Sequence, residues 1–144
     1  MLNYKYRYPL AILNTALSSS SGPRETMSKI QVSARMKIRD DMLEGFKRQA
    51  KECIKQVKEK DSGTLQYDWF LNADKNVCEI RETYENPDAL LAHVTNLREP
   101  LGVLFEKYAT DHSVTLYGEP SVQLLENAKA RGVDIKIYSF LEGI

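Results

Sequence analysis

Cysteine is scarce in this sequence, with Cys53 and Cys78 the only two among 144 residues. They lie far apart and without CxxC spacing, which excludes a disulfide framework of the kind that stabilises small secreted domains, and also a cysteine-rich zinc site. Isolated thiols are usually buried as small hydrophobic side chains. We therefore expect a reducing compartment, a cytoplasmic location, and a packing role for Cys78.

Excess charge and long apolar runs are also absent. The 20 Lys and Arg residues balance 20 Asp and Glu residues, so the formal net charge is zero. Without a net positive field the chain is not expected to bind nucleic acid. No segment approaches the roughly 20 consecutive apolar residues that cross a bilayer, so we expect no membrane association.

Histidine is equally rare, because His93 and His112 are the only imidazoles. They are not at metal-ligand spacing, and the sequence contains no glycine-rich phosphate-binding loop. A metal centre or a nucleotide cofactor is therefore not expected.

The N-terminal region differs in composition from the rest. Lys5 and Arg7 precede a short apolar stretch over 10–17, which loosely resembles a secretory signal, and a Ser-rich run over 18–23 follows. We favour a start at Met27 preceded by an upstream leader.

The whole chain of 144 residues is 42% hydrophobic, enough for one core. We predict a disordered segment or upstream leader over 1–28, a domain over 29–118, and an extension over 119–144 that packs on the domain or on a partner subunit. The first expected elements are a strand over 30–38 and a helix that is capped by Asp40 or Asp41 and ends near 60. Strands over 64–72 and 77–84 follow, and then a helix from 86 to 108 that is kinked or restarted at Pro100. The last expected elements are a strand around 114–116, a helix over 120–129 and a strand over 135–141. The first six elements form the split βαβ order of a ferredoxin-like α+β fold, with helices on one face of an antiparallel sheet. In the expected hairpin Tyr67 lies opposite Glu82, Trp69 beside Ile80, and Leu65 beside Tyr84.

Three short runs carry a family resemblance. They are Gly-Thr-Leu-Gln-Tyr over 63–67, Glu-Thr-Tyr over 82–84, and Ala-Leu-Leu-Ala-His over 89–93. In order and spacing they resemble the antibiotic biosynthesis monooxygenase family of dimeric α+β barrels, over residues 29 to 118. Tyr84 stands where that family more often carries tryptophan.

This resemblance implies a homodimer in which two sheets meet face to face and remove apolar surface from water. It also implies a pocket between the sheet and the second helix. In several branches of the family the activity is oxygenation without metal, flavin or heme. We therefore expect no cofactor, and a small aromatic substrate that reacts with molecular oxygen.

His93, Glu82 and Tyr67 are the predicted catalytic residues. His93 lies on or beside the buried stripe of the second helix, and its ordinary pKa of about 6.5 suits a general base. Glu82 shares a half-buried strand face and needs a partner such as His93 or Arg35, in a structural or an orienting role. The Tyr67 hydroxyl is a candidate donor to an oxyanion, an alternative being Tyr84.

Other aromatic residues are candidates for substrate binding, with ordinary core or interface packing as the alternative. These residues are Trp69, Tyr84, Phe105 and Tyr108. His112 is expected to precede the fourth strand and to be exposed.

Three functions fit these residues. The first is a cofactor-independent monooxygenase acting on a quinol or polyphenol. The second is a heme-binding or heme-degrading member of the same superfamily, with His93 as the ligand. Against it, the first strand has no asparagine and the single tryptophan lies on the second strand. The third is a non-enzymatic stress dimer that holds a small ligand.

Overall fold

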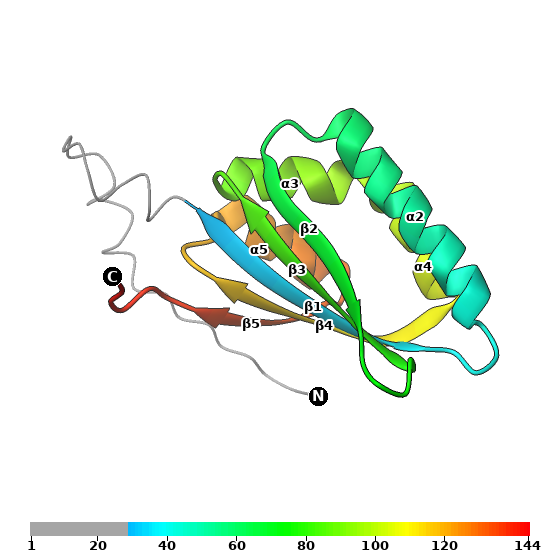
Figure 1. Ribbon diagram of the computed structural model, residues 1–144. Helices are drawn as coiled ribbons and strands as arrows, with labels where there is room; N and C mark the ends of the chain where they lie inside the picture. Colours follow the sequence, from blue (N-terminus) through cyan, green and yellow to red (C-terminus); the bar gives the residue numbers. More distant parts are fainter. Residues whose placement is uncertain (1–28) are drawn as a thin grey trace.

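The structure is a computed structural model that describes residues 29–144, so the predicted leader over 1–28 lies outside the described residues. Its elements are, in chain order, β1 (Ile30–Ile38), α2 (Leu43–Lys60), β2 (Thr64–Leu71), β3 (Val77–Tyr84), α3 (Pro87–Asn96), α4 (Arg98–Lys107), β4 (Ala109–Tyr117), α5 (Val122–Ala130) and β5 (Asp134–Tyr138). Figure 1 shows the helices packed on one side of the sheet. Among the described helices, none combines the length and apolar composition that a bilayer crossing requires.

The sheet order is β2-β3-β1-β4-β5, with β1 in the centre. β1 is antiparallel to β3 and β4, and β2 is antiparallel to β3. This order confirms the ferredoxin-like α+β fold. The predicted sheet was antiparallel throughout, whereas β5 is parallel to β4 and makes the sheet mixed. A parallel neighbour requires a crossover connection, and α5 provides it.

The alternation of β1 divides the sheet into two chemically different faces. Every second residue of β1, from Ile30 at 0% exposure to Ile38 at 8%, is apolar and buried against the helices. Gln31, Arg35 and Lys37 are exposed on the other face. On β1 this outer face is polar, whereas Phe70 on β2, Tyr117 on β4 and Tyr138 on β5 expose large aromatic side chains. The homodimer stays a prediction.

Helix α2 carries the predicted buried stripe, which includes Phe46, Cys53 and Val57. Its start differs from the prediction, because the N-cap is Met42 and no side chain caps the helix. Asp41 instead has φ 60°, a left-handed turn conformation that Asp tolerates better than most residues. The aspartates thus belong to the turn that leads into the helix.

The predicted second long helix is two helices separated at Leu97. Asn86 caps α3 by accepting a hydrogen bond from the Ala89 N–H at 2.8 Å, and Pro87 follows in the first turn. Pro100 lies in the first turn of α4, where a backbone N–H has no helical partner to lose. Pro100 therefore accompanies a restart of the helix rather than a kink within it.

The β2–β3 register agrees with the prediction at two of three pairs. Tyr67 lies opposite Glu82, and Trp69 opposite Ile80. Thr64, not Leu65, is the partner of Tyr84, because the register shifts between Thr64 and Gln66. This irregularity leaves Leu65 51% exposed.

The C-terminal segment packs on the sheet through α5 and β5. Ser121 caps α5 by accepting from the Leu124 N–H at 3.2 Å. β5 ends at Tyr138, so the predicted strand to 141 is too long, and Phe140 and Leu141 are exposed. Of the two expected locations for this segment, the described chain adopts the sheet edge.

Both cysteines are buried core residues. Cys53 and Cys78 are each 0% exposed and neither forms a disulfide. Burial raises the pKa of Cys53 to about 12 and that of Cys78 to about 11. Such thiols stay protonated at neutral pH, which confirms the packing role expected for Cys78.

The contact between α2 and the end of α4 permits a test of packing. A Cβ added at Gly45 would lie 2.3 Å from Cε1 of the Tyr108 ring, whereas one at Gly102 would meet nothing within 4 Å. We expect Gly45→Ala to lower the free energy of unfolding by about 1–3 kcal/mol. Gly102→Ala should raise it by about 0.4–1 kcal/mol. Urea unfolding of both variants measures this, and an unchanged Gly45→Ala midpoint would contradict the packing.

Candidate active site

A cavity of ≈ 140 Å³ lies between the helix-facing side of the sheet and helices α3, α4 and α5. Its floor comes from β1, β3, β4 and β5, and is largely apolar. Its lining from α3 and α4 consists of Leu90, His93, Val94, Leu101 and Phe105. An engineered apolar cavity of about 150 Å³ holds a benzene molecule, so this one has room for a single aromatic ring.

Two buried ionisable residues meet at the β3 side of the cavity. Glu82 is 7% exposed and His93 is 3% exposed, and both line the cavity. Strand alternation places Glu82 on the same face as Ile80, while helical spacing places His93 on the same face as Leu90. His93 Nε2 lies 3.6 Å from Glu82 Oε1. This separation is too long for a direct hydrogen bond, but a hydroxyl group between the two atoms would reach both.

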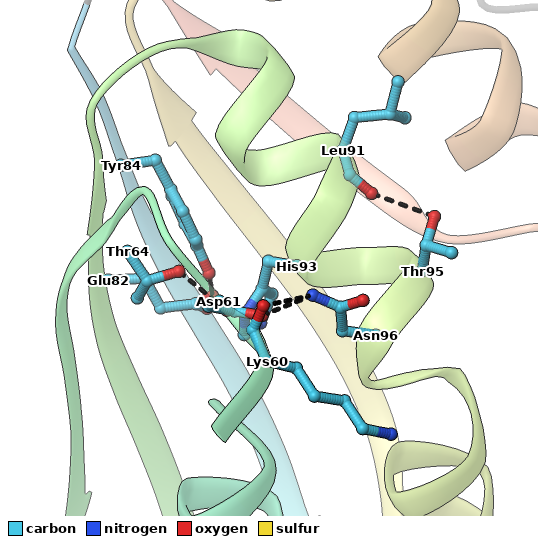
Figure 2. Close-up of polar contacts among 9 residues, drawn as sticks. All are labelled: Lys60, Asp61, Thr64, Glu82, Tyr84, Leu91, His93, Thr95 and Asn96. Carbon is cyan, nitrogen blue, oxygen red and sulfur yellow. Dashed lines mark hydrogen bonds and ion pairs between the residues drawn. The ribbon is translucent and has the colours of Figure 1, made fainter. Parts of the chain in front are cut away.

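Asp61, at the C-cap of α2, holds the other nitrogen of His93 (Figure 2). Its Oδ2 lies 2.7 Å from His93 Nδ1 and accepts from the Thr64 hydroxyl at 2.7 Å. Oδ1 accepts from Asn96 Nδ2 at 2.8 Å. Burial raises the pKa of Asp61, but hydrogen bonds from His93, Asn96 and Thr64 outweigh it and leave the pKa below its usual value. An ionised Asp61 accepts the Nδ1 proton, so Nε2 of the neutral ring is the free base.

Tyr84 supports Glu82 from within the core. Its hydroxyl donates to Glu82 Oε1, and the side chain is fully buried. Burial raises the pKa of Glu82, and this effect exceeds the opposing influences of His93 and Tyr84. Burial, followed by the nearby Glu82 charge, raises the pKa of Tyr84 well above its usual value. Tyr84 was predicted to contact substrate, but it is not among the cavity-lining residues and instead holds Glu82.

Tyr67 on β2 also lines the cavity. Its ring packs edge-on against the His93 ring with centroids 4.9 Å apart. Burial, then the Glu82 charge, raises its pKa well above the usual value, so the phenol stays protonated. Within residues 29–144 the Tyr67 hydroxyl has no hydrogen-bond partner, which leaves it available to a ligand.

Two other predicted substrate-binding residues lie outside the cavity. Trp69 packs against Phe46 and Tyr67, with ring centroids 5.9 and 5.7 Å away. Tyr108 packs on the core beside Gly45. Their aromatic rings support the elements around the site and are not part of the cavity lining.

Phe105 lines the cavity as expected, but it does so together with His112, which was predicted to be exposed. The two rings are stacked with centroids 4.3 Å apart. His112 lies inside β4 and faces the helices, because the register with β1 shifts between Arg35 and Lys37 and Asp111 has φ 54°. Such a bulge re-aims one side chain. Burial lowers the pKa of His112, so its neutral form is favoured.

Asp61 and its partners Thr64 and Asn96 are site residues that the sequence did not predict. Asp61 directly follows the expected end of the first helix near residue 60. A helix C-terminus carries partial negative charge, so a carboxylate there is disfavoured unless other groups compensate it. That unfavourable position was the available signal. Among the described residues, no group of three or more His, Cys, Asp and Glu side chains is arranged to hold a metal ion.

Comparison with protein families identifies the domain that carries this cluster. Residues 30–97 match the family described as antibiotic biosynthesis monooxygenase. The chain carries a domain of this family. The matched segment supplies Asp61, Tyr67, Glu82, His93 and Asn96, whereas Phe105, His112 and the α5–β5 wall lie beyond it.

Solved structures share the monooxygenase-domain fold at low sequence identity. MupZ from Pseudomonas fluorescens is 19% identical with a TM-score of 0.71, and the match covers 81% of this chain and 93% of MupZ. A candidate antibiotic biosynthesis monooxygenase from Caulobacter crescentus is 18% identical with a TM-score of 0.59, covering 69% of this chain and 96% of that one. Rv0793 from Mycobacterium tuberculosis is 21% identical with a TM-score of 0.57, covering 65% and 97%. Comparison with the curated proteins gives no match.

Proposed function

We propose that the protein is a cofactor-independent monooxygenase that oxidises a phenolic substrate, a quinol or polyphenol, with molecular oxygen. The main support is the buried pairing of His93 with two carboxylates at the wall of an apolar cavity. Asp61 fixes the Nδ1 proton at 2.7 Å, and Nε2 faces Glu82 at 3.6 Å. Membership of the monooxygenase family is consistent with this chemistry.

The proposed reaction begins with proton transfer from the substrate hydroxyl to His93 Nε2. The resulting phenolate is electron-rich, and a ring carbon forms a bond with oxygen. The O–O bond then breaks, so that one oxygen atom stays on the ring and the other leaves as water. The quinol supplies the two electrons that this step consumes, and the product is a hydroxyquinone. No external reductant is needed.

The side chains around His93 have separate roles in this reaction. The apolar floor excludes water, which strengthens the electrostatic effect of each polar group. Tyr67, whose hydroxyl is unpartnered in the described chain, donates to the developing oxyanion. Glu82 carries a pKa raised by burial, so it can hold a proton at a higher pH than an exposed glutamate and deliver it during O–O cleavage.

Heme binding through His93 is a weaker alternative on this geometry. One ring nitrogen is held by Asp61 and the other faces Glu82, so an iron ligand would require Glu82 to move. A cavity of ≈ 140 Å³ also suits one ring rather than a porphyrin.

Oxygen consumption with hydroquinones and dihydroxynaphthalenes tests the proposal. We expect the native chain to consume oxygen faster than autoxidation, and the product to contain one atom from ¹⁸O₂. Glu82→Gln should lower the enzymatic rate about tenfold or more. Glu79→Gln, an exposed residue of the same strand, is the matched control and should leave the rate unchanged.

Two results would contradict the oxygenase. Uptake no faster than autoxidation across the panel would do so directly. Saturable binding of an aromatic ligand without uptake would favour the non-enzymatic ligand-binding alternative.

A further inference from the structure

The cavity floor is formed by residues paired across four strands. Glu82 on β3 pairs with Val32 on β1, and Val32 with Leu116 on β4. A parallel row joins Ile80, Ala34, Val114 and Ile135. Since neighbouring strands are about 4.8 Å apart, roughly 14 Å separate the β3 and β5 sides. The His93–Glu82 pair therefore occupies only one side of the cavity.

The opposite side is bounded by one face of α5 and by β5. Leu124, Asn127, Ala128 and Arg131 line the cavity, and their spacing of three, one and three residues places them on one helix face. This face changes from apolar to cationic along the chain, because Leu124 is buried at 5% exposure and Arg131 is exposed at the C-cap.

Asn127 and Arg131 on this face have side-chain donors that are free to bind a ligand. Asn127 Oδ1 accepts from Gln123 at 3.1 Å, which leaves the Asn127 amide protons without a partner in the described chain. Arg131 forms no ion pair with any residue from 29 to 144. A guanidinium with free donors binds a carboxylate through two parallel hydrogen bonds.

We propose that Arg131 and Asn127 bind the carboxylate of an aromatic acid whose ring lies in the cavity. The charges at the two sides determine the direction of the ligand. Ionised Asp61 disfavours a second carboxylate near His93, whereas Arg131 attracts one. The ligand therefore presents its phenolic hydroxyl to His93 and its carboxylate to α5. The orientation at His93 rests on the proposed oxygenase, but carboxylate binding at α5 does not.

Anaerobic calorimetric titration of the full chain tests this site without any oxygen chemistry. The probes are 3-(4-hydroxyphenyl)propionate and its neutral amide, which differ at the carboxylate end only. We expect the native protein to bind the acid about tenfold more tightly than the amide. Arg131→Gln should abolish this preference and leave the affinity for the amide unchanged.

Lys129→Gln is the matched control, because Lys129 is also a last-turn cation of α5 but does not line the cavity. It should retain the preference for the acid. Equal affinities for acid and amide in the native protein, or no saturable binding of the acid, would overturn the site. An equal loss of preference in both variants would also overturn it, and would indicate a general effect of positive charge at the helix end.

These outcomes are separable from failure of the proposed function. Acid preference that depends on Arg131, without oxygen uptake, would support the carboxylate site and contradict the oxygenase. Oxygen uptake with neutral quinols and no acid preference would support the oxygenase and contradict the carboxylate site.

Discussion

Replacement of His93 by alanine is expected to lower the rate of phenol oxidation by about 10²- to 10⁴-fold, the usual contribution of a positioned general base. The substitution removes Nε2, which faces Glu82 at 3.6 Å, and with it the group that accepts the substrate proton. Initial rates of oxygen uptake at saturating substrate measure the loss. Added imidazole should restore part of the rate, because it supplies a base in the space that the ring vacated.

His112→Ala is the control for loss of an imidazole from the cavity wall. His112 stacks on Phe105 and has no carboxylate partner in the described chain. We expect weaker substrate binding with a turnover rate within a few-fold of native. If His112→Ala reduced turnover as much as His93→Ala, or if imidazole restored nothing to His93→Ala, His93 would not be the base.

Replacement of Asp61 by alanine is expected to reduce the free energy of unfolding by about 2–5 kcal/mol, because each buried donor left without its acceptor costs about 1–3 kcal/mol. The Asp61 side chain is 2% exposed and accepts hydrogen bonds from His93, Asn96 and Thr64. The alanine variant leaves His93 Nδ1 and the Thr64 hydroxyl without this acceptor, and Asn96 Nδ2 keeps only its contact with Lys60 O at 3.4 Å. Urea unfolding followed by circular dichroism measures the change.

Acid titration measures how much of the stability depends on the negative charge of Asp61, separately from the packing of its side chain. The pKa of Asp61 is lower in the folded state than in the unfolded chain, so the unfolded chain takes up a proton first as the pH falls. The stability that Asp61 supplies is therefore complete above its unfolded pKa of about 3.9 and is lost below it. Asp61→Asn should remove this part of the acid sensitivity. Asp68→Ala, at an exposed site on β2, should change stability by less than about 0.5 kcal/mol. Equal effects of Asp61→Ala and Asp68→Ala would contradict the buried network.

The fold was predictable because its strands and helices have regular periodicities. Alternation from Ile30 to Ile38 indicated a strand with one buried face, and Asn86-Pro87 indicated the start of α3. The errors fall where the backbone departs from regularity. The shift after Thr64 displaced Leu65, and the bulge at Asp111 turned His112 inward. Neither departure changes the spacing of apolar residues, so periodicity does not reveal it.

The candidate site was only partly predictable, because its members come from distant segments. His93 and Glu82 lie on buried faces that periodicity identifies, and the family resemblance drew attention to both. Asp61 is 32 residues from His93 in sequence and meets it only when α2 ends beside α3. Arg131 reaches the cavity only because α5 crosses over to place β5 parallel to β4. Contacts between residues so distant in sequence depend on tertiary packing, which local sequence patterns do not reveal.

The central position of β1 has a consequence for synthesis on the ribosome. β1 is made before both of its neighbours, since β3 ends at Tyr84 and β4 at Tyr117. At about 5–20 residues per second, the nascent strand stays unpaired for several seconds. An unpaired strand with one apolar face can associate with other chains. Arg35 and Lys37, which are exposed in the folded sheet, put positive charge into this strand and so act as gatekeepers against aggregation while the rest of the domain is translated.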